Sequence, residues 1–173
     1  MSITISQLVV RANEAMRLAH AQLEVEDGGR EVAKLQGNIA GHKNFIEDLS
    51  AEFGLTQFFL DDTGDTSLVL SDLEEAQLEE IQADINLLKK SSSWVATLAR
   101  IDVRTQEMKD FLLERADKSR SLDICQGKHQ AHIAYQAFFN AVESALLTAR
   151  QRSAEKKSEL PFDDDDEDSE SEE

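Results

Sequence analysis

The only proline of this 173-residue chain is Pro161, so residues 1–160 contain no residue that lacks a backbone amide hydrogen. Glycine occurs only seven times, and an aromatic content of 6% is low for a β-sandwich or barrel. We therefore expect an all-α protein. No segment approaches the roughly 18 uncharged apolar residues of a membrane-spanning helix, and a single cysteine cannot form an internal disulfide. These features predict a soluble, cytoplasmic protein.

Apolar residues follow one another at alternating spacings of three and four between residues 32 and 53. Such a narrow stripe fits a coiled coil or a pair of long helices better than a compact globule. The predicted oligomer seam consists of Val32, Leu35, Ile39, Ile46, Leu49 and Phe53. His42 occupies the remaining position, where we interpret it as structural or as a pH-sensitive contact. Because one chain offers few helices to cover such long stripes, the pattern predicts a homo-oligomer.

Four long helices are predicted from this spacing and from the residues that interrupt it. Asp27-Gly28-Gly29 separates the first two helices, Gly54 ends the second, and Ser71 with Glu74 has capping-box spacing. At Ser91-Ser92-Ser93 the apolar stripe changes phase, so the third helix either runs through or breaks there, and we favour one bent helix. The predicted helices, at about residues 6–26, 30–53, 71–117 and 121–155, form one helical bundle or coiled-coil domain over residues 1–157.

Residues 56–70 combine two apolar segments with a polar turn. Thr56–Leu60 and Ser67–Leu70 flank Asp61–Thr66, and such β-branched and aromatic segments around a glycine are typical of a short β-hairpin. The alternative is an irregular connector whose apolar side chains cover the end of the bundle, since two strands alone are marginally stable. The acids of the turn lack the spacing of a helix-loop-helix calcium site.

Charge is distributed unevenly along the chain. Asp and Glu number 35 against 18 Lys and Arg, which gives a formal net charge of −17. Ten of the acids lie in residues 159–173, which contain no base, so we expect residues 158–173 to form a disordered acidic tail. Residues 118–157 have seven bases and only three acids. The order is therefore an acidic body, a mildly basic helix and a very acidic tail.

The tail places a few apolar residues before a run of carboxylates, a combination that can anchor and attract a basic protein. The predicted partner-binding residues are Leu160, Phe162, Asp163, Asp164, Asp165, Asp166, Glu167 and Asp168. Over about 14 residues, Leu160-Pro161-Phe162 and the following acids resemble the acidic tails of single-stranded-DNA-binding proteins, which recruit other proteins. Those tails end in apolar residues, whereas this one ends in Ser169–Glu173.

Basic residues of the last predicted helix are candidates for contact with nucleic acid. They are Lys128, Arg150, Arg152, Lys156 and Lys157. A few phosphate contacts per subunit bind weakly, although an oligomer multiplies them. The alternative is that bases near the end of a helix complement its dipole and increase solubility.

Cys125, His129 and His132 share one helical stripe and form the most plausible metal-ligand pattern. Residues seven apart lie about 10 Å from each other along a helix, so a zinc site would need ligands from another helix or subunit. We favour the alternative that they are structural or solvent-facing polar residues. Carboxylate pairs such as Glu107 with Asp110 resemble the magnesium ligands of helical nucleotide hydrolases, but an acid-rich chain contains such pairs by chance.

The sequence contains no phosphate-binding loop, nucleophile elbow or zinc-protease helix motif. We therefore expect no enzymatic activity and no cofactor. The leading hypothesis is an oligomeric coiled-coil regulatory or assembly protein. Its acidic surface and tail would bind a basic partner protein, itself often a nucleic-acid-binding protein, and it would act as a nucleic-acid mimic, inhibitor or chaperone.

The alternative is a nucleic-acid accessory protein of the replication or recombination mediator type. In it the basic helix binds nucleic acid, and the tail is both autoinhibitor and recruiting peptide. Deleting residues 159–173 separates the two hypotheses. The first predicts loss of partner binding without DNA binding, and the second predicts tighter DNA binding.

Overall fold

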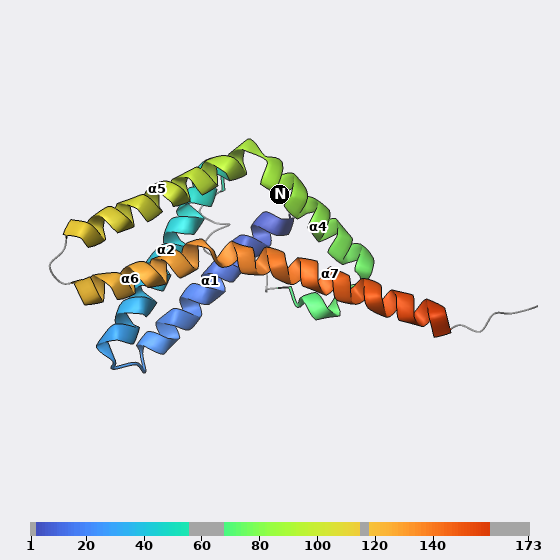
Figure 1. Ribbon diagram of the computed structural model, residues 1–173, viewed down its shortest axis with the longest axis horizontal. Coiled ribbons are helices and arrows are strands. Elements are labelled where there is room, and N and C mark those ends of the chain that lie inside the picture. Colours follow the sequence, from blue (N-terminus) through green and yellow to red (C-terminus); the bar gives the residue numbers. More distant parts are fainter. Residues whose placement is uncertain (1–2, 56–67, 115–117, 160–173) are drawn as a thin grey trace, which may run out of the picture.

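A computed structural model describes residues 3–55, 68–114 and 118–159, without the side chains of residues 118 and 157–159. All regular structure in these residues is helical, which confirms the all-α prediction (Figure 1). The elements are α1 (Ile3–Leu23), α2 (Gly29–Phe53), the short 3₁₀ helix η1 (Leu70–Asp72), α4 (Glu75–Lys90), α5 (Ser92–Glu114), α6 (Lys118–His132) and α7 (Ala134–Glu159). Among the described residues, no helix has the length and apolar character needed to cross a membrane.

Of the β-hairpin predicted at residues 56–70, only residues 68–70 are described, and they form no strand. Residues 56–67 lie outside the described residues, and Leu68 and Val69 lead directly into η1. The Leu68 amide donates a hydrogen bond to Oε1 of Gln7 (2.9 Å), and its carbonyl accepts one from the Arg11 guanidinium (2.9 Å). The backbone groups of Leu68 are thus bonded to side chains of α1 rather than to another strand, so the described residues do not confirm the hairpin.

The helix expected over residues 71–117 is divided into α4 and α5. Ser91 has an extended backbone with a ψ of 144°, and its hydroxyl donates to the Leu88 carbonyl (2.8 Å). The same hydroxyl accepts a hydrogen bond from the Trp94 amide (3.1 Å), so Ser91 both ends α4 and caps α5. The sequence analysis favoured one bent helix over a break at Ser91–Ser93, so the less favoured alternative is the one observed.

The capping box at the start of α4 lies three residues later than predicted. Glu74, rather than Ser71, precedes the first turn, and its amide donates to Oε1 of Gln77 (2.9 Å). The Glu74 side chain completes the box by accepting from the amide of Gln77. The predicted last helix is also divided, because Ile133 forms a turn between α6 and α7.

Helices α1 and α2 are antiparallel neighbours, and so are α4 and α7 (Figure 1). Helix α2 also packs against α6 and α5, so it lies at the centre of one end of the molecule. The hydrophobic core lies where these helices meet. Trp94, which is only 2% exposed, has its ring centroid 5.1 Å from that of Tyr135 and 5.8 Å from that of Phe139. These rings join α5 to α7 in an aromatic cluster.

The predicted oligomer seam is covered within one chain to different degrees. Leu35, Ile46 and Leu49 are buried, whereas Val32, Ile39 and Phe53 are half-buried. Helices α1, α5 and α6 supply the contacts. A second subunit is therefore not needed to cover α2, and the role of this stripe in oligomerisation stays a prediction.

Candidate functional site

Helices α2 and α6 cross with their backbones in direct contact. A Cβ atom placed on Gly37 would meet the carbonyl group of Ile124, and one placed on Gly127 would meet that of Lys34. No side chain larger than hydrogen fits at either position without moving one helix. The sequence analysis missed this crossing, and the available signal was the four-residue spacing of Gly37 and Gly41.

An ion pair holds the beginnings of the same two helices together. Arg30 donates to both carboxylate oxygens of Asp123, at 3.2 and 3.4 Å. Asp123 has a side chain only 1% exposed, while that of Arg30 is 82% exposed, so the guanidinium covers a buried carboxylate. The hydrogen bond and charge of Asp123 raise the pKa of Arg30.

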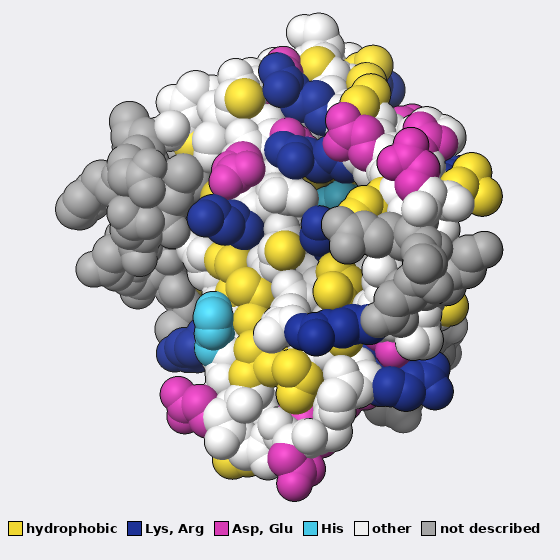
Figure 2. Space-filling view, turned by 90° about the vertical axis from the view of Figure 1, so that its left-hand side faces the viewer, with side chains coloured by type: hydrophobic (Ala, Val, Ile, Leu, Met, Phe, Trp, Pro, Cys, Tyr) yellow, Lys and Arg dark blue, Asp and Glu magenta, His cyan; other side chains and the backbone are white. Residues whose placement is uncertain are grey.

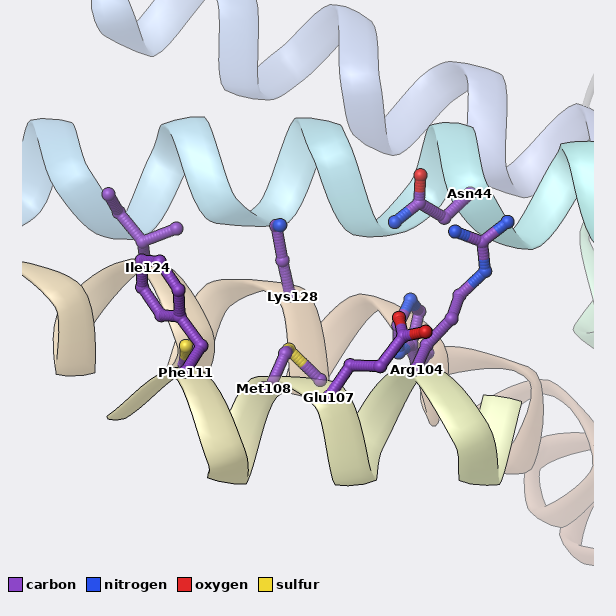
Figure 3. Close-up of a pocket in the computed structure, with 9 residues that line it drawn as sticks. Asn44, Arg104, Glu107, Met108, Phe111, Ile124 and Lys128 are labelled. Carbon is purple, nitrogen blue, oxygen red and sulfur yellow. The ribbon is translucent and has the colours of Figure 1, made fainter. Parts of the chain in front are cut away.

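Opposite this crossing, α6 is separated from α5 by a pocket of about 300 Å³. The side chains of α5 and α6 point toward one another beneath α2, as Figure 3 shows. The pocket is lined by Asn44 of α2, by Arg104, Glu107, Met108 and Phe111 of α5, and by Ile124, Cys125, Lys128 and His132 of α6.

Arg104 ties α5 to α2 at one end of the pocket. Its guanidinium donates two hydrogen bonds to Asp48, at 2.8 and 2.9 Å, and Asp48 is 3% exposed. Hydrogen bonding to Asp48 is the main cause that raises the pKa of Arg104. This two-point geometry holds both groups in fixed positions, and the positive charge of Arg104 is compensated.

His132 is completely buried at the same end of the pocket. Neither ring nitrogen has a hydrogen-bond partner within the described part of the chain. Burial lowers the pKa of His132 to about 4, and the charge of Arg104 contributes in the same direction. The imidazole is therefore neutral near pH 7 and has one donor and one acceptor nitrogen to satisfy.

Two of the three residues in the suggested metal-ligand pattern line this pocket. They are Cys125 and His132, whereas His129 is exposed. Within residues 3–55, 68–114 and 118–159, no group of three His, Cys, Asp or Glu side chains is placed to hold a metal ion. Burial raises the pKa of the Cys125 thiol, and the charge of Lys128 opposes this shift only in part.

The basic residues suggested for nucleic-acid contact do not form one surface. Lys128 lines the pocket between α5 and α6, whereas the others lie toward the end of α7. Arg150 is bound to α4, with Nη2 2.7 Å from Glu79 and Nε 3.8 Å from Glu75. Arg152 and Lys156 are exposed on α7, and the side chain of Lys157 lies outside the described residues.

The predicted partner-binding tail also lies outside the described residues, since the description ends at residue 159. The described part contains another acidic surface, which the sequence analysis did not identify. Asp102, Asp110 and Glu114 of α5 are exposed, and none forms an ion pair with a described residue. The aliphatic residues Val103 and Leu113 lie among them, 58% and 79% exposed.

We call this surface the α5 outer face, defined as Val95, Asp102, Val103, Asp110, Leu113 and Glu114. At 3.6 residues per turn these six positions fall within about one third of the helix circumference. They therefore form one continuous stripe along α5. Its signal in the sequence was the spacing of acids and aliphatic residues, which the buried apolar stripe of the same helix obscured.

The chain has no detected relative. Comparison with protein-family models, with curated proteins and with solved structures found no match.

Proposed function

We propose that this protein is a non-catalytic binding protein that docks a basic partner protein on the α5 outer face. The observation that carries the proposal is that this face exposes carboxylates without cationic partners among the described residues, alternating with exposed aliphatic side chains. Carboxylates attract a basic surface over long range, while aliphatic side chains need apolar contact once the surfaces meet. The acidic tail adds ten carboxylates to the same attraction.

The ion pairs within residues 1–157 support the proposal that the partner is basic. Four arginines, namely Arg30, Arg100, Arg104 and Arg150, are paired with carboxylates of the same chain. Their positive charge is compensated at short range. The carboxylates of the α5 outer face have no such compensation apart from the neighbouring Lys109, so a basic partner meets a net negative stripe.

A protein partner fits this face better than nucleic acid. Phosphate groups would be repelled by the carboxylates, and the exposed aliphatic residues offer a phosphate backbone no favourable contact. Arg150, one of the suggested phosphate contacts, is already bound to Glu75 and Glu79. A partner that normally binds nucleic acid has the required basic surface, so the protein would act as a mimic, inhibitor or chaperone toward it.

We retain self-association as part of the proposal, with a changed location. The stripe on α2 is partly covered within one chain, so we propose that a coiled-coil or other contact between copies uses exposed apolar residues elsewhere. Leu87, near the end of α4 and outside the α5 outer face, is 68% exposed. Two copies would present two acidic faces and bind a repetitive or dimeric partner more tightly. We expect the encounter to take place in the cytoplasm.

The test compares two triple variants that remove the same charge. The first neutralises the α5 outer face with Asp102→Asn, Asp110→Asn and Glu114→Gln. The matched control, Glu24→Gln, Glu80→Gln and Glu143→Gln, neutralises exposed carboxylates elsewhere. Pull-downs from the native host, followed by mass spectrometry, should recover a basic protein with the wild type and the control. The α5 variant should lose it, and about 0.5 M salt should release it.

Equal capture by the two triple variants would contradict a role for the α5 outer face. A second comparison uses residues 1–158, in which the tail is deleted, and a fluorescent single-stranded oligonucleotide. Binding of the oligonucleotide that becomes tighter without the tail would favour the nucleic-acid accessory hypothesis instead. Loss of the basic partner with no DNA binding supports the proposed function.

A further inference from the structure

The pocket between α2, α5 and α6 has a hydrophobic end and a polar end. Figure 3 shows the Phe111 ring beside Ile124 at one end, with Met108 next along α5. Asn44 and Arg104 lie at the other end. The volume of about 300 Å³ lies at the lower limit for pockets that bind small molecules. An amphiphilic molecule with one apolar and one polar part matches this division.

The buried His132 brings two hydrogen-bonding nitrogen atoms to the polar end of the pocket. Its side chain is 0% exposed, lines the pocket, and has both ring nitrogens without partners among the described residues. A buried polar group without a hydrogen bond destabilises the fold. A molecule in the pocket that accepts from or donates to His132 would remove this cost.

Lys128 determines the preferred charge of the ligand. It lies one turn before His132 on α6, is half-buried, and extends into the pocket toward α2 (Figure 3). No carboxylate pairs with it in the described part of the chain, whereas Arg104 is already neutralised by Asp48. A half-buried ammonium group without a counter-charge favours an anion.

The surroundings of the pocket carry charges of both signs. Figure 2 shows the end of the molecule where α5 ends and α6 begins, and there Lys, Arg, Asp and Glu side chains all stand among hydrophobic ones. Glu107, at the polar end, repels an anion and keeps the anionic group near Lys128.

We propose that this pocket binds a small organic anion with a flat aromatic body. Its carboxylate, sulfonate or phosphate group lies at Lys128. Its aromatic body lies against Phe111, Met108 and Ile124, and a polar substituent reaches His132. This site is separate from the α5 outer face, because it lies on the side of α5 that faces α6.

The test uses 1-anilinonaphthalene-8-sulfonate, an aromatic sulfonate that fluoresces in apolar surroundings, and its uncharged counterpart N-phenyl-1-naphthylamine. The full chain should bind the sulfonate saturably and the neutral compound more weakly. Lys128→Met should weaken sulfonate binding about tenfold, the loss expected for one charged hydrogen bond. Glu107→Gln should tighten it about threefold, because a repelling charge is removed. Lys90→Met, a change in an exposed lysine of α4, is the matched control and should have no effect.

A second measurement locates the bound probe. Cys125 is the only cysteine of the chain and lines the pocket, so the bound sulfonate should slow its reaction with a thiol reagent such as Ellman's reagent. Circular dichroism melting checks that each variant is folded. Equal binding of both compounds with no effect of Lys128→Met would overturn the proposal, since it would show a nonspecific apolar surface. Absence of binding at about 1 mM, the weak limit of specific recognition, or an unprotected Cys125 would also overturn it.

Discussion

On its side toward α2, helix α6 lies backbone against backbone, whereas on its side toward α5 the same helix borders a pocket of about 300 Å³. Glycine residues form the contact between α6 and α2. Long side chains such as Met108, Phe111 and Lys128 line the pocket between α6 and α5. Contact through glycine leaves no free volume, so it defines one relative position of two helices. Contact through long side chains leaves space that a ligand can occupy.

The two sides of α6 therefore perform different tasks. The crossing of α2 and α6 is the rigid part, held by Gly37 and Gly127 and closed at its beginning by Arg30 with Asp123. Helix α5 is attached to this unit at a few points, of which Arg104 with Asp48 is the strongest. A helix attached in this way can present an outer face to a partner and an inner face to a small molecule.

The largest expected effect on stability comes from adding a methyl group at the crossing of α2 and α6. Gly127→Ala should lower the free energy of unfolding by about 3 kcal/mol or more, because the added methyl group meets the backbone carbonyl of Lys34. Gly29→Ala is the matched control, since a Cβ atom there has no neighbour within 4 Å. Urea denaturation followed by circular dichroism measures both. Similar stability of the two variants would show that the crossing is not closely packed in solution.

The second effect concerns the attachment of α5. Asp48→Asn should destabilise the fold by about 2 kcal/mol, because it leaves Arg104 beside a buried site without its counter-charge. Glu52→Gln removes a comparable but more exposed pair with Arg100, 2.6 Å apart, and should change stability by less than about 1 kcal/mol. Thermal melts of both variants test this order. A larger effect of Glu52→Gln would mean that α5 is held mainly by its exposed pair.

The sequence was sufficient to predict an all-helical chain, because proline is absent before residue 161, glycine is scarce and the aromatic content is low. It was insufficient for the two helix breaks. At Ser91 the break depends on a hydroxyl that can either cap a new helix or point to solvent within a continuous one. The conformation of Leu68 was also not predictable, because it depends on Gln7 and Arg11 from a distant segment.

The candidate sites were predictable to a lesser degree. The sequence placed Cys125 and His132 on one stripe, and the structure brings both to one pocket, with Arg104 and Glu107 contributed by α5. No periodicity in a single helix indicates which side chains of another helix lie opposite. The glycine crossing had a visible signal in the spacing of Gly37 and Gly41, yet small residues also occur in helices that do not cross.

The third prediction is that mild acid destabilises the pocket side of α6. Burial lowers the pKa of His132 to about 4, below its ordinary value of about 6.5 in the unfolded chain. As pH falls below about 6.5, the unfolded chain takes up a proton that the folded chain does not, so stability is lost until about pH 4. The expected loss from this group is about 1 kcal/mol between pH 7 and 5.5.

The charges that face His132 are Arg104, Lys128 and His129, which disfavour its protonation, and Asp48, which favours it. His132→Leu should therefore reduce the pH dependence of stability in this interval, whatever its effect at pH 7. His42, whose pKa burial also lowers to about 4, should contribute to the slope in the same direction. An unchanged slope in His132→Leu would show that solvent reaches this imidazole.

The smallest expected change in the free energy of unfolding is at a position only two residues from the position with the largest. Cys125 and Gly127 are neighbours on α6, but Cys125 lines the pocket and Gly127 contacts the backbone of α2. Cys125→Leu adds apolar volume toward free space rather than toward a carbonyl group, so the cost of overpacking is absent. We expect its free energy of unfolding to stay within about 0.5 kcal/mol of the wild type, measured by urea denaturation beside Gly127→Ala. The added side chain should also weaken binding of the aromatic sulfonate, because it occupies part of the pocket. If Cys125→Leu were as destabilising as Gly127→Ala, α6 would be closely packed on both sides, and the distinction between a rigid crossing and an open pocket would fail.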